Sequence, residues 1–162
     1  MTEDDVTRLA RVLGRKCLKK RVLVATAESC TGGGVATAIT RISGSSKWFD
    51  RAFVTYSNDA KREMLGVSQA SLRRHGAVSE EVARGMALGA LRRSPADICV
   101  AITGIAGPTG GSRTKPVGLV WFAWAARGQL VRARRFRFRG NRVAVRIQSV
   151  AVALQGLSDL LQ

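Results

Sequence analysis

The chain has 162 residues, 46% of them apolar, which is enough for one buried core and indicates a single domain over residues 1–162. No stretch approaches the roughly 20 apolar residues of a membrane-spanning helix, so the composition argues against a membrane protein. Lys and Arg number 27 and Asp and Glu 11, and the resulting net charge of +16 attracts anions, including nucleic acid.

Cysteine use and the first residues bear on the compartment. Cys17, Cys30 and Cys99 are odd in number and lack the spacing of metal ligands. Residues 1–5 are acidic, whereas a signal peptide begins with basic residues. We therefore expect a reducing, cytoplasmic compartment, and we expect no bound metal ion, no cofactor and no membrane partner.

Hydrophobic spacing predicts the elements in chain order. Apolar residues three and four positions apart indicate helices, and short apolar runs indicate buried strands. The expected elements are a helix over Asp5–Lys19, a strand over Val22–Thr26, a helix over Val35–Ile42, a loop at Gly44–Ser46, a strand over Phe49–Ser57, helices over Asn58–Leu65, Ser68–Arg74 and Glu80–Arg92, strands over Ile98–Thr103, Val117–Ala125 and Leu130–Phe138, and a helix over Arg142–Leu161.

These elements predict an α/β fold. Five strands with helices between and around them indicate a three-layer α/β/α sandwich with a mixed, mostly parallel five-stranded sheet. Strand, helix and strand over residues 22–57 suit a right-handed parallel crossover. Arg127-Gly128 suits a hairpin turn between the last two strands.

The last predicted strand changes phase. Val131 and Ala133 share one face, whereas Phe136 and Phe138 share the other. A β-bulge near Arg134-Arg135 would account for the change, because one extra residue exchanges the faces of everything that follows.

The stretch from Ala27 to Gly34 joins a predicted strand to a predicted helix. Ser29 stands at the end of the strand, where open α/β sheets place their ligands. Glycines allow a sharp bend, and the free amide N–H groups of a helix start favour anions. The combination indicates a site. The alternative is that Thr31 only caps the helix and Ser29 only fills the turn.

A serine nucleophile needs a base. His75, the single histidine, ends a helix and is expected to be an exposed cation, so neither a serine–histidine triad nor a histidine metal site is expected. Lys61 lies near a helix start, which disfavours a cation and should lower its pKa, and burial would lower it further. Ser29, Lys61 and Thr103 all stand at or just after strand ends, and amides of the loop after Thr103 could hold an oxyanion. Cys30 is the competing nucleophile.

Four blocks of sequence resemble the signature of the CinA C-terminal domain family. They are Ala27–Gly33, Phe53–Lys61, His75–Ala83, and Thr103–Pro108 with Lys115–Gly118. The resemblance runs in order along nearly the whole chain. It implies a three-layer α/β/α domain that hydrolyses the carboxamide of nicotinamide mononucleotide (NMN) to nicotinic acid mononucleotide and ammonia. It also implies a homo-oligomer, most simply a dimer.

The resemblance implies a role for each site residue. Ser29 is the nucleophile and Lys61 the base, and Tyr56 and Thr103 occupy the other catalytic polar positions. The implied substrate-binding residues are Glu28, Thr31, Gly32, Gly33 and Gly104, with Arg142 or Arg146 on the phosphate. The chain departs from the family pattern at Asn141, where an aspartate often precedes the arginine.

The alternative function is a basic nucleic-acid-binding or competence- and damage-associated module without strong catalysis. The arginines between Arg132 and Arg146 motivate it, because basic clusters attract the phosphate backbone. No recognised nucleic-acid-binding motif accompanies them. We therefore expect at most weak and non-specific binding of nucleic acid.

Overall fold

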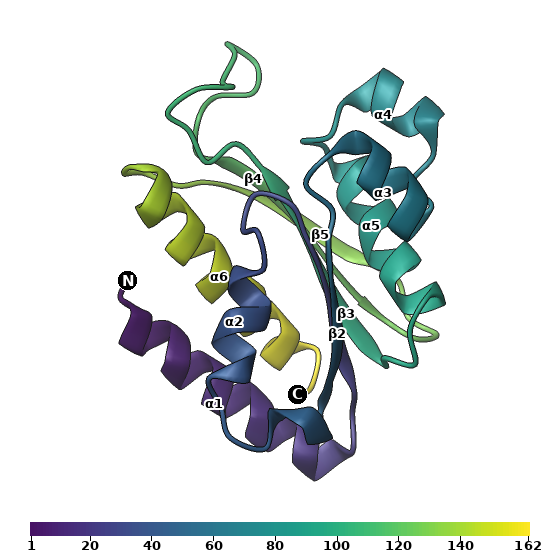
Figure 1. The fold of residues 1–162 in the computed structure, drawn as a ribbon, viewed down its shortest axis with the longest axis vertical. Helices are drawn as coiled ribbons and strands as arrows, with labels where there is room; N and C mark the ends of the chain where they lie inside the picture. The colour runs from purple at the N-terminus through teal and green to yellow at the C-terminus, as the bar shows by residue number, and fades with distance from the viewer.

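The computed structural model describes residues 1–162 (Figure 1). Its elements are α1 (Glu3–Lys20), β1 (Val24–Glu28), α2 (Gly34–Thr40), the 3-10 helix η1 (Ser45–Lys47), β2 (Phe49–Val54), α3 (Asn58–Leu65), α4 (Gln69–His75), α5 (Glu80–Arg92), β3 (Ile98–Gly104), β4 (Leu119–Ala126), β5 (Arg132–Arg137) and α6 (Arg142–Asp159). Every predicted helix and strand is present, and η1 occupies part of the predicted loop.

The strands form one sheet in the order β2-β1-β3-β4-β5. β1 is parallel to β2 and β3, whereas β4 is antiparallel to both β3 and β5. All strands except β4 therefore point the same way, which confirms the mixed, mostly parallel sheet. Figure 1 shows α1, α2 and α6 on one side of it and α3, α4 and α5 on the other. The predicted three-layer sandwich is confirmed.

Each face of the sheet has its own apolar core. The core under α1 and α6 is partly aromatic, and Phe122 stacks on Trp124 with ring centroids 5.4 Å apart. The core under α5 consists largely of alanine, so α5 lies close to the sheet. Gly89 lets α3 approach α5 closely, because a Cβ there would collide with the carbonyl oxygen of Leu65. This packing fixes the position of α3, the helix that carries Lys61.

β1 begins at Val24 and not at Val22 as predicted. Arg21 adopts a left-handed conformation at the end of α1, and the N–H of Val22 still donates to the last turn of that helix. The chain therefore turns before strand pairing begins. At its other end the strand extends to Glu28, beyond the predicted Thr26, and Ser29 is the first residue after it.

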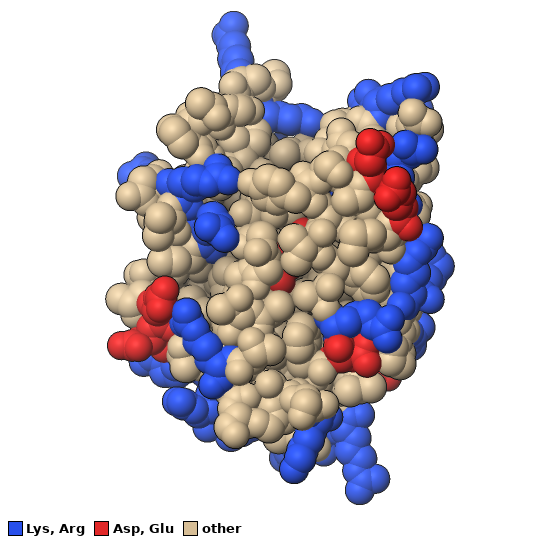
Figure 2. All heavy atoms as spheres, in the orientation of Figure 1, with Lys and Arg blue, Asp and Glu red and all other residues tan.

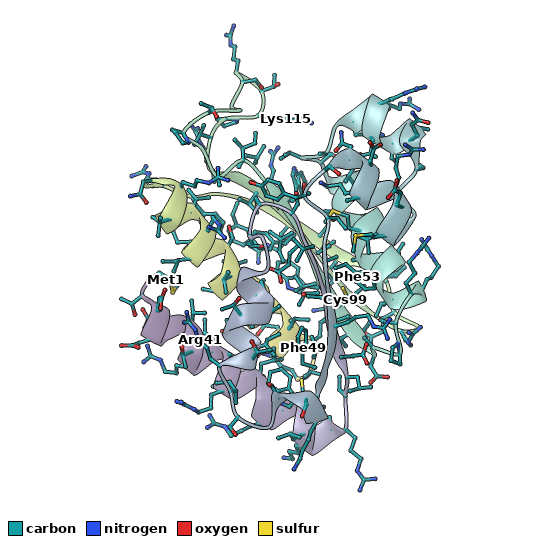
Figure 3. All side chains as sticks on the ribbon, in the orientation of Figure 1. Met1, Arg41, Phe49, Phe53, Cys99 and Lys115 are labelled. Atoms are coloured by element: carbon teal, nitrogen blue, oxygen red, sulfur yellow. The ribbon has the colours of Figure 1, made fainter.

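β2 contains a bulge that was not predicted. Phe49 and Arg51 pair with consecutive residues of β1, so Asp50 has no counterpart there. The residues after the bulge exchange faces relative to a regular strand. Figure 3 accordingly shows Phe49 and Phe53 on opposite sides of the sheet.

The bulge predicted in β5 is absent, and that prediction was wrong. Arg132–Arg137 pair with Leu119–Trp124 in unbroken register. The change of phase has another cause, because β5 is an edge strand and each of its faces is covered over only part of its length. Ala133 packs against the core under α5, and Phe136 packs against the core under α6. Arginines occupy the uncovered positions, and Arg134 lies 5.2 Å from the centroid of the Phe136 ring.

The surface carries the excess of positive charge. Figure 2 shows Lys and Arg side chains mainly around the outline of the face in view, with few over its centre. Only a few of them pair with acidic side chains, as Arg41 does with Glu3 at 3.1 Å. No helix combines the length and apolar character needed to cross a membrane.

Candidate active site

Three hydroxyl-bearing residues lie side by side where β2, β1 and β3 end. The N–H of Ser29 donates to the Ile102 carbonyl at 2.9 Å, and the N–H of Thr55 donates to the Glu28 carbonyl at 2.8 Å. These bonds extend both parallel registers by one residue, so Thr55, Ser29 and Thr103 form a row across the sheet. All three are buried, and strand alternation places them on the face covered by α5.

Lys61 reaches this row from near the start of α3. Its Nζ lies 3.1 Å from Ser29 Oγ and donates to the Thr55 carbonyl oxygen at 2.9 Å. The side chain is buried, and no carboxylate forms an ion pair with it. Burial removes water from the ammonium and so lowers the pKa of Lys61. The direction agrees with the prediction, and burial is the main cause.

Glu28 and Thr31 lie behind the turn that follows Ser29. Glu28 is completely buried on the α2 side of the sheet. Its carboxylate accepts from Thr31 Oγ1 at 2.8 Å, from the N–H of Val35 at 2.9 Å and from the N–H of Ala36 at 3.0 Å. Neither Glu28 nor Thr31 lines the cavity that contains Ser29. Their side chains fasten the turn to α2, which differs from the substrate contact implied by the resemblance.

The predicted glycines divide between two places. Gly32 and Gly33 have left-handed φ angles of 57° and 91°, a conformation that residues with a Cβ rarely adopt. These two glycines therefore let the chain turn from β1 into α2. Gly32 lines a groove between α1, α2 and α6, on the far side of the turn from the Ser29 cavity. Gly104 ends β3 and lines the Ser29 cavity itself.

A cavity of about 270 Å³ opens over Ser29 and Lys61. Its other lining residues come from the end of β3, the segments after β1, β2 and β3, the start of α3, the α4–α5 connection and α6. They are Cys30, Tyr56, Asn58, Ala77, Val78, Thr103, Gly104, Ile105, Ala106, Gly107, Thr109, Gly110 and Arg142. Among the lining residues, Cys30 and Ala106 have N–H groups that donate to no backbone carbonyl. These two groups are the candidates for a ligand contact beside the hydroxyl row.

The two candidate arginines lie in different places. Arg142 donates from Nη1 to the Gly107 carbonyl at 2.7 Å and from Nη2 to the Tyr56 hydroxyl at 2.8 Å, so it bridges two sides of the cavity. Arg146 donates to the Thr31 carbonyl at 2.9 Å and lines the groove behind the turn. Arg142 therefore belongs to the Ser29 cavity, and Arg146 does not.

Cys30 and Thr103 also line the cavity, but the thiol of Cys30 is protonated and the hydroxyl of Thr103 is already engaged in a hydrogen bond. Burial raises the pKa of the Cys30 thiol to about 12, so the thiolate, which is the nucleophilic form, is disfavoured at neutral pH. Thr103 Oγ1 donates its proton to the Ala77 carbonyl at 2.8 Å. Cys30 is thus a poor nucleophile, and the Thr103 hydroxyl holds the α4–α5 connection against the end of β3.

Sequence reasoning missed Thr55 and the backbone of Ala77 and Gly107. Thr55 stands immediately before Tyr56 in a block that the sequence analysis had singled out. Its place beside Ser29 depends on the bulge in β2, which carries no clear sequence signal. The carbonyl groups of Ala77 and Gly107 are backbone contacts, and the residue type does not reveal them.

The chain is similar to known proteins in both sequence and structure. The chain is 54% identical over 158 residues to the nicotinamide-nucleotide amidohydrolase PncC of Escherichia coli (strain K12), covering 97% of this chain and 95% of the relative. It is 50% identical over 157 residues to PncC of Pseudomonas putida, covering 97% and 98%. The crystal structure of the competence/damage inducible protein CihA from Agrobacterium tumefaciens superposes with a TM-score of 0.96 at 50% identity, covering 98% of this chain and 96% of that one.

The family itself is defined by a match over almost the entire chain. Residues 6–161 match the CinA C-terminal domain, and this range includes the hydroxyl row, Lys61 and Arg142. The match to the family, the similar fold of a solved relative and the sequence identity over nearly the whole chain all lead to the same family assignment. This chain belongs to the CinA C-terminal domain family.

Proposed function

We infer that this chain is a nicotinamide-nucleotide amidohydrolase, which converts NMN and water to nicotinic acid mononucleotide and ammonia. The PncC relatives are named for this activity and align over 97% of the chain. The observation that carries the proposal is the contact between Ser29 Oγ and Lys61 Nζ, 3.1 Å apart and buried beneath a cavity. A serine beside a neutral lysine suits acyl transfer.

The reaction proceeds through an acyl-enzyme. Ser29 Oγ attacks the carboxamide carbon while its proton passes to the neutral amine of Lys61, and the carbonyl electron pair moves onto oxygen. The carbonyl then re-forms, Lys61 returns the proton to the amide nitrogen, the C–N bond breaks and ammonia leaves. Water attacks the acyl carbon and gives a proton to Lys61. The bond to Ser29 Oγ breaks, Lys61 restores the serine proton, and the acid is released.

Two further groups of contacts support the same reaction. Cys30 and Ala106 line the Ser29 cavity and their N–H groups donate to no backbone carbonyl, so they are the donors proposed for the oxyanion. Thr103, one of the catalytic polar positions that the resemblance implies, already donates its hydroxyl proton to the Ala77 carbonyl. Arg142 at the cavity rim is the residue proposed to bind the phosphate of the mononucleotide.

Ammonia release from NMN tests the proposal. Ser29→Ala and Lys61→Met should each lower kcat by about a thousandfold or more, because they remove the nucleophile and its base. Ser46→Ala is the matched control, since Ser46 is exposed and distant in sequence from every residue that lines the cavity. Circular dichroism checks that the variants fold. Full activity in Ser29→Ala would end the proposal.

The resemblance also supports a homo-oligomer, most simply a dimer, in the cytoplasm. Leu130 and Val143 are large apolar side chains that are 93% and 61% exposed, and an interface would cover such surface. The three cysteines are free, as a reducing compartment requires. Sedimentation velocity over a wide concentration range tests the oligomer, and a monomer throughout would contradict it.

A further inference from the structure

Thr55 Oγ1 is the one buried side-chain nitrogen or oxygen in the protein without a hydrogen-bond partner. Thr55 is completely buried, and an unpaired hydroxyl in that position costs stability. The other two hydroxyls of the row are paired, because Thr103 donates to Ala77 and Ser29 contacts Lys61. An unpaired polar atom that a protein retains beside its catalytic pair asks for a functional explanation.

Thr55 is connected to the catalytic pair in two ways. Its backbone carbonyl oxygen accepts a hydrogen bond from Lys61 Nζ at 2.9 Å. The extended register of β1 and β2 sets its side chain beside that of Ser29, on the same face of the sheet. The hydroxyl therefore lies on the side of the sheet from which Lys61 approaches.

The number of hydrogen-bond donors on Lys61 changes during the reaction. Lys61 Nζ donates to the Thr55 carbonyl and lies 3.1 Å from Ser29 Oγ, and in the proposed reaction the lone pair of the neutral amine takes the serine proton across that second contact. After proton transfer the ammonium carries three N–H donors and no lone pair. The Thr55 carbonyl takes one of them, and the atom that will receive the proton takes another. The third donor needs an acceptor in a buried site.

We propose that Thr55 is a positioning residue whose Oγ1 accepts this third N–H of the Lys61 ammonium. The inference rests on the proposed amide hydrolysis, in which the proton moves from Ser29 Oγ to Lys61 Nζ and then to the leaving nitrogen. No bond of Thr55 forms or breaks. An acceptor that is unpaired in the resting state and paired in the charged state stabilises the transition state more than the ground state.

Thr55→Val tests the inference, with Thr55→Ser as the conservative variant. Valine keeps the shape of the side chain and removes only the hydroxyl. We expect kcat for NMN to fall by about ten- to a hundredfold, the usual range for a hydrogen bond to a charged group, while KM is unchanged. The melting temperature should stay the same or rise, because an unpaired buried hydroxyl has been removed. Thr55→Ser should keep most of kcat.

The pH profile supplies a readout that a merely structural role would not move. Loss of the acceptor destabilises the ammonium, so the pKa of Lys61 falls further and the acid limb of kcat/KM moves to lower pH. A tenfold effect corresponds to about one pH unit. Side-chain ¹³C and ¹⁵N NMR of Lys61, assigned with Lys61→Met, measures the same shift without substrate.

The two proposals can fail separately. If the wild-type protein releases no ammonia from NMN, the proposed function fails, and the NMR titration still decides whether Thr55 supports the ammonium. If Thr55→Val keeps wild-type kcat and the pKa of Lys61 is unchanged, the inference about Thr55 is wrong. The same holds if Thr55→Ser loses as much activity as Thr55→Val, because the hydroxyl would then not be the group that matters.

Discussion

Replacing Arg142 with alanine should weaken the use of NMN far more than the use of nicotinamide riboside. The Arg142 guanidinium has five N–H donors. Two of them are occupied by hydrogen bonds to the Gly107 carbonyl and the Tyr56 hydroxyl, so three remain for a ligand phosphate. One charge-assisted contact contributes about 1.5–3 kcal/mol, which is a loss of about ten- to 150-fold in kcat/KM on NMN. The riboside has no phosphate, so kcat/KM on the riboside should fall only by the amount that results from losing the Arg142 contact with the Gly107 loop.

Arg146→Ala is the matched control. Arg146 lies one helical turn further along α6 and donates to the Thr31 carbonyl behind the nucleophile turn. Its replacement should affect both substrates equally, because any effect acts through the turn. Ammonia release with each substrate gives the four values of kcat/KM that the comparison needs.

Equal losses on NMN and the riboside in Arg142→Ala would refute the phosphate assignment. The phosphate contact would then have to come from Arg113 or Lys115 in the β3–β4 loop. Figure 3 shows Lys115 reaching from that loop toward α4, where its Nζ donates to the His75 carbonyl. Charge and loop position make it the next residue to replace.

Three further outcomes are expected. The kcat/KM of the wild type should rise with pH through the lowered pKa of Lys61. Between that pKa and 10.5 the folded state binds fewer protons than the unfolded state, so the free energy of unfolding should also rise with pH over this window. Lys61→Met should abolish this rise in the free energy of unfolding. Glu28→Ala should lower the free energy of unfolding by about 3 kcal/mol or more, because two backbone amides of α2 lose a carboxylate acceptor. Urea titrations measure the change, and a loss below about 1 kcal/mol would contradict this expectation. Binding to DNA should weaken steeply with salt, and salt-resistant binding would revive the nucleic-acid alternative.

The meeting of Ser29 and Lys61 was predictable, and its reason is topological. Parallel neighbouring strands end at one edge of the sheet, so side chains just after β1 and β2 converge. The order of the remaining strands could not be derived in this way, although the fold class could. The sequence therefore predicts which residues stand at strand ends, and the structure shows which of these strand ends are neighbours.

The roles of neighbouring residues were harder to predict, because they depend on strand alternation. Glu28 and Ser29 are adjacent, yet one faces α2 and the other faces Lys61. A strand taken to end at Thr26 gives no reason to separate them. Arg142 and Arg146 share one face of α6, and only their distance from the start of the helix decides which reaches the cavity.

The bulge at Asp50 gives β2 one residue more than its pairing with β1 uses. Deleting Asp50 would join Phe49 directly to Arg51, and these two residues already pair with consecutive residues of β1, so every later pair would be kept. The side chain of Thr55 would still lie beside that of Ser29, on the side from which Lys61 approaches. A second deletion in β2 would have no bulge to absorb it, so Thr55 would pair with Glu28 and turn toward α2. Chimaeras between family members should therefore tolerate the loss of one residue from β2 but not of two.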